Sequence, residues 1–155
     1  MSSVQTSLLL IFVLVILYPN YLLSADMASI NGEKVLLREA AEKKSRALWE
    51  LGSGFPVEII KQKGDWLFIK DFENDRGWIH KSRITRKQHV VVKVNKNEEQ
   101  AINVRKEPNL ESLVVANAFY GVVFSLLQKR DGWIEVQHDS GVKGWIKAEL
   151  LWGIE

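Results

Sequence analysis

The chain has 155 residues, enough for one ordinary domain or two very small ones. It carries 21 Lys and Arg residues against 19 Asp and Glu residues, and this near-balance argues against nucleic acid as the main partner. The absence of cysteine excludes disulfides, thiol catalysis and cysteine-ligated metals. With 46% hydrophobic and 26% charged residues, the composition is typical of a globular protein.

The N-terminal segment predicts export. Residues 1–25 contain no charged side chain, and residues 8–18 form an unbroken apolar run that ends before Pro19. Spanning a bilayer takes about 20 residues, so this run has instead the length of a signal-peptide core. We therefore expect a helical signal peptide over 1–25, cleaved after the small residue Ala25. The alternative is an uncleaved membrane anchor, because no basic residue precedes the run.

The rest of the chain contains two copies of one sequence repeat. When the sequence is shifted by 67 positions, residues 34–84 align with residues 101–151 without a gap. Repetition at a fixed period indicates two copies of one structural unit. We place the copies at 26–85 and 89–155, joined by a linker over 86–88. Glycines and tryptophans coincide in the alignment: Gly54 with Gly121, Trp66 with Trp133, Gly77 with Gly144, and Trp78 with Trp145.

Each copy predicts short strands separated by turns. Asn31-Gly32, just before the first strand, is a hairpin signal. The expected strands are 34–38, 47–51, 55–63, 66–70 and 76–80, then 101–105, 114–118, 122–129, 133–137 and 143–147. Short helical turns follow at 81–84 and 148–151, and one more strand, 89–94, is expected to tie the copies together. The fold class is therefore all-β, with two small five-stranded barrels in tandem.

Alternation along the strands assigns side chains to faces. Within residues 133–137, the charged Glu135 side chain is expected to face solvent. Its neighbours Ile134 and Val136 are therefore expected to face the core. The same register buries Leu67 and Ile69. It turns four aromatic side chains outward, namely Trp66, Phe68, Trp78 and Trp133.

Three segments of the second copy read INVRKEP over 102–108, DGWIEV over 131–136 and GWI over 144–146. In this order they resemble the bacterial SH3-like domain family. The first copy is similar, although it has Leu36 where the family has Asn and Ala40-Ala41 where the loop usually has Gly-Pro. The resemblance covers about residues 28–152. It implies five-stranded barrels that act as binding modules in exported proteins, periplasmic or extracellular, some of which bind peptidoglycan or its peptides.

Seven side chains are the candidate ligand-binding residues: Trp66, Trp133, Phe68, Trp78, Trp145, Arg38 and Arg105. An exposed tryptophan offers a large contact area at low entropic cost and suits peptide binding. The alternative is that the rings cover the barrel ends or, for Phe68, the junction between copies. Arg38 and Arg105 begin the long loops 39–46 and 106–113, where each would either capture an acidic ligand group or hold loop carbonyls.

A basic stretch connects the copies and contains Lys81, Arg83, Arg86 and Lys87, flanked by His80 and His89. It is expected either to meet an anionic polymer or to be a solvated connector. The three histidines lack metal-ligand spacing, and no catalytic, phosphate-binding or dinucleotide-binding motif is present. We therefore expect no enzyme activity, no metal, no cofactor and no small-molecule substrate.

Two functional hypotheses follow. The first is an exported, non-catalytic binding protein of the cell envelope that recognises a peptide, a protein or a peptidoglycan component through shallow tryptophan-lined grooves. The second is a regulatory or scaffold subunit that docks onto an envelope enzyme or sensor without binding the wall. A membrane enters only if the N-terminal segment is not cleaved.

Overall fold

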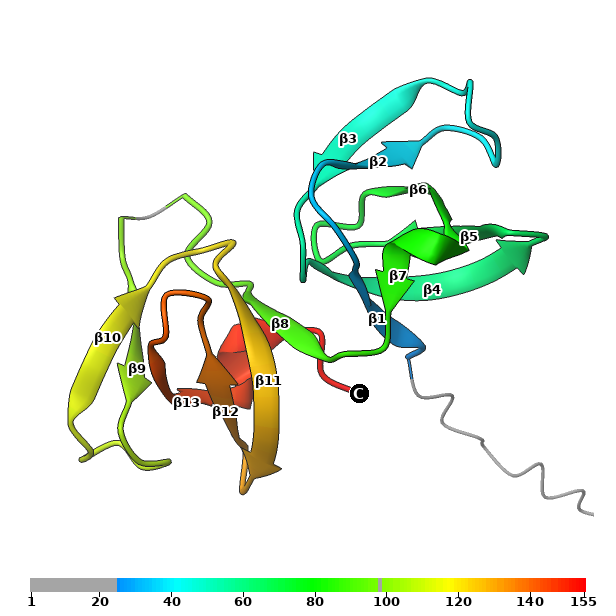
Figure 1. The fold of residues 1–155 in the computed structure, drawn as a ribbon. Helices are drawn as coiled ribbons and strands as arrows, with labels where there is room; N and C mark the ends of the chain where they lie inside the picture. The colour runs from blue at the N-terminus through cyan, green and yellow to red at the C-terminus, as the bar shows by residue number, and fades with distance from the viewer. Residues whose placement is uncertain (1–24, 98) are drawn as a thin grey trace, which may run out of the picture.

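The computed structural model describes residues 25–97 and 99–155. The signal peptide predicted over 1–25 lies, apart from its last residue, outside this range. Figure 1 shows the described part as two curled β-units joined through the segment from β7 to β8. Within these residues, the helices are too short and too polar to cross a membrane.

The first unit is one antiparallel sheet with the strand order β3-β2-β6-β5-β4-β1-β7. Its strands are β1 (Met27–Ile30), β2 (Val35–Arg38), β3 (Ala47–Leu51), β4 (Pro56–Lys63), β5 (Trp66–Lys70), β6 (Arg76–His80) and β7 (Ile84–Thr85), with the short 3-10 helix η1 (Lys81–Arg83) before β7. The five strands predicted from sequence correspond to β2 through β6.

The second unit repeats this order as β10-β9-β13-β12-β11-β8-β14. Its elements are β8 (His89–Val92), β9 (Ile102–Arg105), β10 (Val114–Ala118), β11 (Val123–Arg130), β12 (Trp133–Gln137), β13 (Lys143–Lys147), η2 (Ala148–Leu150) and β14 (Leu151–Trp152). The strand positions and the tandem all-β architecture predicted from the repeat are therefore confirmed.

Each sheet adds two short strands to the five predicted, because β1 or β8 pairs with a long strand on one side and with a two-residue strand on the other. Of these added strands, β8 corresponds to the strand expected at 89–94. One local prediction was wrong. Asn31-Gly32 does not form a hairpin. It links β1 to β2, which pair with different neighbours, and the amide of Asn31 donates to the Arg83 carbonyl.

The long strands β4 and β11 close each unit by pairing at both ends. β4 pairs with β1 near its start and with β5 along the rest, and its register shifts between Ile59 and Lys61. β11 shifts at the matching place, between Leu126 and Gln128. Such an extra residue bends a strand and increases its twist, which lets one strand serve two neighbours.

Each unit has its own core. The predicted inward positions are confirmed, because Leu67, Ile69, Ile134 and Val136 are all buried. The first core consists of Ala28, Ile30, Val35, Leu37, Leu51, Val57, Leu67, Ile69 and Ile79. The second consists of Val90, Val92, Ile102, Val104, Ala118, Phe124, Ile134, Val136, Ile146 and Leu151.

Contacts between the units join the tip of the β5–β6 hairpin to the second unit. The Phe72 and Tyr120 ring centroids lie 5.3 Å apart, and the Tyr120 hydroxyl donates to Glu73. Lys96 forms an ion pair with the same Glu73 carboxylate. Burial, together with the hydrogen bond to Glu73, raises the pKa of Tyr120 to about 12. The two barrels are thus bound to each other by apolar and charged contacts as well as by the chain.

Candidate functional site

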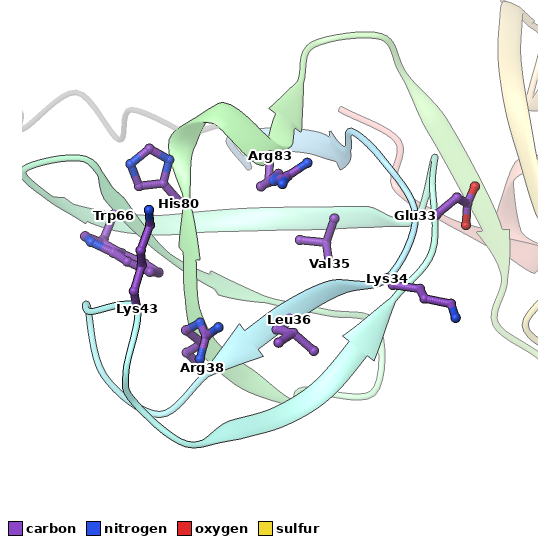
Figure 2. Close-up of a pocket in the computed structure, with 9 residues that line it drawn as sticks. All are labelled: Glu33, Lys34, Val35, Leu36, Arg38, Lys43, Trp66, His80 and Arg83. Atoms are coloured by element: carbon purple, nitrogen blue, oxygen red, sulfur yellow. The ribbon is translucent and has the colours of Figure 1, made fainter.

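A cleft of about 340 Å³ opens on the first unit, along β2 and the ends of β5 and β6 (Figure 2). Trp66, His80 and Lys43 lie at one end of it, and Glu33 and Lys34 at the other. Nine residues line the cleft: Glu33, Lys34, Val35, Leu36, Arg38, Lys43, Trp66, His80 and Arg83. The structure therefore brings two predicted site residues, Trp66 and Arg38, to one place.

Trp66 is positioned by the strands on either side of it. It begins β5 after the Gly64-Asp65 turn and lies directly opposite His80 of β6. The two rings meet edge to face, with their centroids 5.4 Å apart. His80 is held in turn by Ser82, whose backbone amide donates to the Nδ1 atom of the ring. The indole is half-buried, so the cleft presents an aromatic wall that is fixed in place.

Arg38 anchors the loop over residues 39–46. Its Nη1 atom donates to the carbonyl of Ser45 at 2.6 Å, and the Ser45 hydroxyl accepts from the amide of Ala40 at 2.7 Å. Arg105 and Ser112 repeat both bonds in the second unit. The alternative in which these arginines hold loop carbonyls is therefore what the structure shows. Because Arg38 uses only one of its five donors in this bond, it can also face a ligand.

The cleft is strongly cationic. Lys34, Arg38, Lys43 and Arg83 line it, and among the residues that the structure describes none of the four forms an ion pair. Glu33 is the single acidic lining residue. Unpaired cations around an aromatic wall favour a ligand that offers both negative charge and an apolar surface.

Phe68 and Trp78 form a separate aromatic patch on the outer face of β5 and β6. Their ring centroids lie 5.1 Å apart, and both side chains are half-buried. The Lys61 Nζ atom lies 4.9 Å from the Phe68 centroid, within the range of a cation–π contact. The two residues do not line the cleft, although Trp78 pairs with Arg38 across the sheet.

The second unit arranges its predicted site residues differently. Trp133 lines a separate pocket of about 420 Å³ together with Asp131, Gly132, Lys147, Ala148 and Glu149. Arg105 is absent from that lining and contacts its loop instead.

Trp145, one of the candidate ligand-binding residues, is buried. Its side chain is only 4% exposed, because the Arg130 guanidinium lies 4.6 Å from the centre of the ring and covers it. Glu135 is directly opposite Trp145 on β12 and is also mostly covered, with 14% of its side chain exposed. Strand alternation gave the correct face for Glu135 but could not predict that a side chain from the end of β11 covers this face.

The cationic lining of the first cleft was missed by sequence reasoning. Lys34, Lys43 and Arg83 lie far apart in the chain, and only Arg83 was noticed, as part of the basic stretch. A usable signal was present in the repeat. The aligned residues of the second copy are Ala101, Leu110 and Leu150, so these three cations are specific to the first copy.

The basic stretch between the units does not act as one surface. Lys81 is paired with Asp65 at 2.8 Å, and Arg86 is paired with Asp26. Arg83 lines the first cleft, whereas Lys87 lines a pocket between the units together with His89. The cations of this stretch are close in the sequence, but in the folded protein they lie at different sites and have different partners.

Comparison with known proteins agrees with this architecture. A curated relative is the putative N-acetylmuramoyl-L-alanine amidase YrvJ of Bacillus subtilis (strain 168), 23% identical over 108 residues. The match covers 66% of this chain but only 21% of that protein, so the chain spans about a fifth of its relative's length.

Similar solved structures include NlpC2 from Trichomonas vaginalis, with a TM-score of 0.38 and 14% identity over 83% of this chain and 48% of that one. Another is an NlpC/P60 family protein from Bacillus cereus ATCC 10987, with a TM-score of 0.36 and 14% identity over 81% of this chain and 55% of that one. The family model described as bacterial SH3 domain matches twice, over residues 31–85 and 98–153. The chain therefore belongs to the bacterial SH3 domain family, of which it carries two tandem copies.

Proposed function

We propose that this protein is an exported, non-catalytic binding protein of the bacterial cell envelope that recognises a peptide component of the wall. The observation that carries the proposal is the cleft of Figure 2, where Trp66 and Arg38 are brought together beside an anchored loop. Such a site binds by stacking and charge, and recognition of this kind needs no reacting group. The relationship to a putative N-acetylmuramoyl-L-alanine amidase supports the wall as the place where it acts.

Within this proposal the predicted residues have unequal parts. Trp66 and Arg38 contact the ligand in the first unit, while Trp133 offers a second contact beside its own pocket. Phe68 and Trp78 offer a separate aromatic contact on the outer face of β5 and β6. Trp145 and Arg105 support the fold of the second unit, because one is buried and the other is bonded to its loop.

Sedimentation with purified peptidoglycan tests the proposal. The full-length wild-type protein is expected to sediment with the wall, and Trp66→Ala is expected to reduce the bound fraction severalfold. Trp49→Ala is the matched control, because Trp49 is 58% exposed on β3 and does not line the cleft. Failure of the wild type to sediment would refute wall binding. Release of soluble wall fragments by the pure protein would refute its non-catalytic character.

A second candidate function is docking onto an envelope protein. It is favoured by exposed apolar side chains gathered on β10 and the loop before it, namely Leu110, Leu113, Val114 and Val115. Exposed apolar groups in one region are typical of protein interaction surfaces. Cross-linking in the native envelope distinguishes the two functions, since docking predicts one dominant protein partner and wall binding predicts recovery of wall fragments.

A further inference from the structure

We infer that the cleft of the first unit selects an acidic peptide, one that presents carboxylates together with apolar side chains, and that the second unit lacks this selectivity. The inference deepens the proposed function, because it names the ligand chemistry of the same cleft. It depends on the residues that differ between the two copies.

The first step is the charge of the cleft. Lys34, Arg38, Lys43 and Arg83 place four cationic groups around one cavity, against the single carboxylate of Glu33. Within the described residues none of these four cations forms an ion pair, whereas the neighbouring Lys81 is paired with Asp65. Like charges left together without counterions repel one another, so a ligand that supplies carboxylates relieves this repulsion. The planar fork of an arginine suits a carboxylate especially well.

The second step is the comparison between copies. Where the first unit has Lys34, Lys43 and Arg83, the second has Ala101, Leu110 and Leu150. The tryptophan is present in both copies, and the arginine anchors its loop in both. The three extra cations are exposed and are not needed to form the barrel, since the sister barrel folds without them. A binding role accounts for cations that the fold does not require.

The third step decides between a peptide and a phosphate-bearing glycopolymer. The cleft is lined by Val35, Leu36 and the Trp66 ring as well as by cations. Apolar side chains of a peptide gain free energy by covering such a surface, whereas a chain of sugar or polyol phosphates has few apolar groups to place there. The mixed lining therefore favours the peptide.

Three labelled probes test the inference by fluorescence anisotropy with the full-length protein. They are an acetylated hexapeptide of alternating Glu and Leu, the same peptide with Gln in place of Glu, and a glycerol phosphate oligomer. The wild type is expected to bind the Glu peptide roughly tenfold or more tightly than the Gln peptide, as is typical when charged hydrogen bonds are lost. This preference is expected to weaken with added salt.

The test variant replaces the three cations by the residues of the second copy, as Lys34→Ala, Lys43→Leu and Arg83→Leu together. It is expected to lose the preference for the Glu peptide and to remain folded. The matched control is Arg76→Ala, Lys93→Ala and Lys106→Ala together, which removes the same charge at exposed positions that lie outside the cleft. This control is expected to keep most of the preference.

The outcomes separate this inference from the proposed function. Equal binding of the Glu and Gln peptides, or tighter binding of the phosphate oligomer, overturns the inference even when the protein sediments with the wall. An equal loss of Glu-peptide binding in the test and control variants also overturns it, because net charge and not the cleft would then explain binding. Selective binding of the Glu peptide without sedimentation would support the inference and refute wall binding.

Discussion

Gly144 shows how a single missing side chain sets the distance between two strands. A Cβ atom built at this position would lie 2.7 Å from the Arg105 carbonyl oxygen and 2.8 Å from Val104 Cγ1, closer than real contacts allow. Gly77 has the same relation to the Arg38 carbonyl in the first unit, at 2.8 Å. The repeated glycines thus let β6 and β13 lie against the strands that end in the loop-anchoring arginines.

Substitution of Gly144 is expected to be costly. Gly144→Ala should lower the free energy of unfolding by about 1–3 kcal/mol, because the backbone atoms it meets cannot move aside easily. Urea unfolding measures the effect. Gly52→Ala is the control, since its nearest neighbour would be 3.9 Å away. Similar losses in both variants would contradict the close approach of β13 and β9.

Substitution of Glu135 is expected to destabilise the protein more than substitution at an exposed strand position. The Glu135 carboxylate accepts from Gln128 at 2.6 Å and pairs with Lys143 at 3.0 Å. Burial is the largest single influence on its pKa and raises it, but the bonds from Lys143 and Gln128 together outweigh burial and lower the pKa.

Glu135→Lys is therefore expected to lower the free energy of unfolding by about 1–2 kcal/mol, because it places an ammonium group beside Lys143 and Arg130. Thermal unfolding checks this value. Glu149→Lys should change stability by less than about 0.5 kcal/mol, since the Glu149 side chain is 69% exposed and its pairing with Lys147 is weak. An effect of Glu135→Lys as small as that of the control would show that the Glu135 contacts carry no stability.

At the scale of elements, each of the two long loops is held at its ends by an arginine and a serine, and we call this pair of hydrogen bonds the latch. Arg105 donates to the Ser112 carbonyl at 2.8 Å, while the Ser112 hydroxyl accepts from the amide of Glu107 at 2.8 Å. The first unit has the same latch between Arg38, Ser45 and Ala40, although its loop sequence differs almost throughout. The latch therefore fixes the loop ends and leaves the loop surface free to vary.

Removal of the serine hydroxyl tests the latch. Ser112→Ala is expected to leave the Glu107 amide without its partner and to lower the free energy of local loop opening by about 1 kcal/mol. Hydrogen exchange at Glu107 should accelerate severalfold, while amides of the β11–β12 hairpin should keep their rates. Ser45→Ala should have the matching effect at Ala40. Unchanged exchange at both amides would contradict the latch.

At the scale of the whole molecule, His89 links the two barrels. Its ring lies over Gly54 of the first unit, so close that a Cβ there would be 3.0 Å from the ring. Burial is the main cause that lowers the pKa of His89, and the charge of Lys87 acts in the same direction. The Lys87 carbonyl, which bonds to the ring, and Asp139 act against this shift.

A lowered histidine pKa predicts a junction that weakens in acid. Neutral His89 contributes its full stability above the unfolded pKa of about 6.5, and this contribution is lost as the pH falls from there toward the folded value. Wild-type stability should therefore fall more steeply than that of His89→Gln between about pH 7 and pH 5. Denaturant midpoints measured across this range give the comparison. Parallel curves for the two proteins would contradict the role of His89.

Several features of this protein follow from its sequence alone. Strand positions and buried faces, such as those of Leu67 and Ile134, could be predicted because alternation is a local property of the chain and the repeat showed it twice. The tandem all-β fold followed from the same signals, and the family from its resemblance to the segments at 102–108, 131–136 and 144–146.

The tertiary structure alone decided which side chains meet. Lys34, Lys43 and Arg83 line one cleft with Trp66 only because closure of the sheet brings the start of β2, a loop and η1 together. Arg130 covers Trp145 only because β11 and β13 flank the same strand, β12. Periodicity assigns a residue to a face, but the neighbours on that face come from distant parts of the chain, so the charge of the cleft could be known only once the barrel was closed.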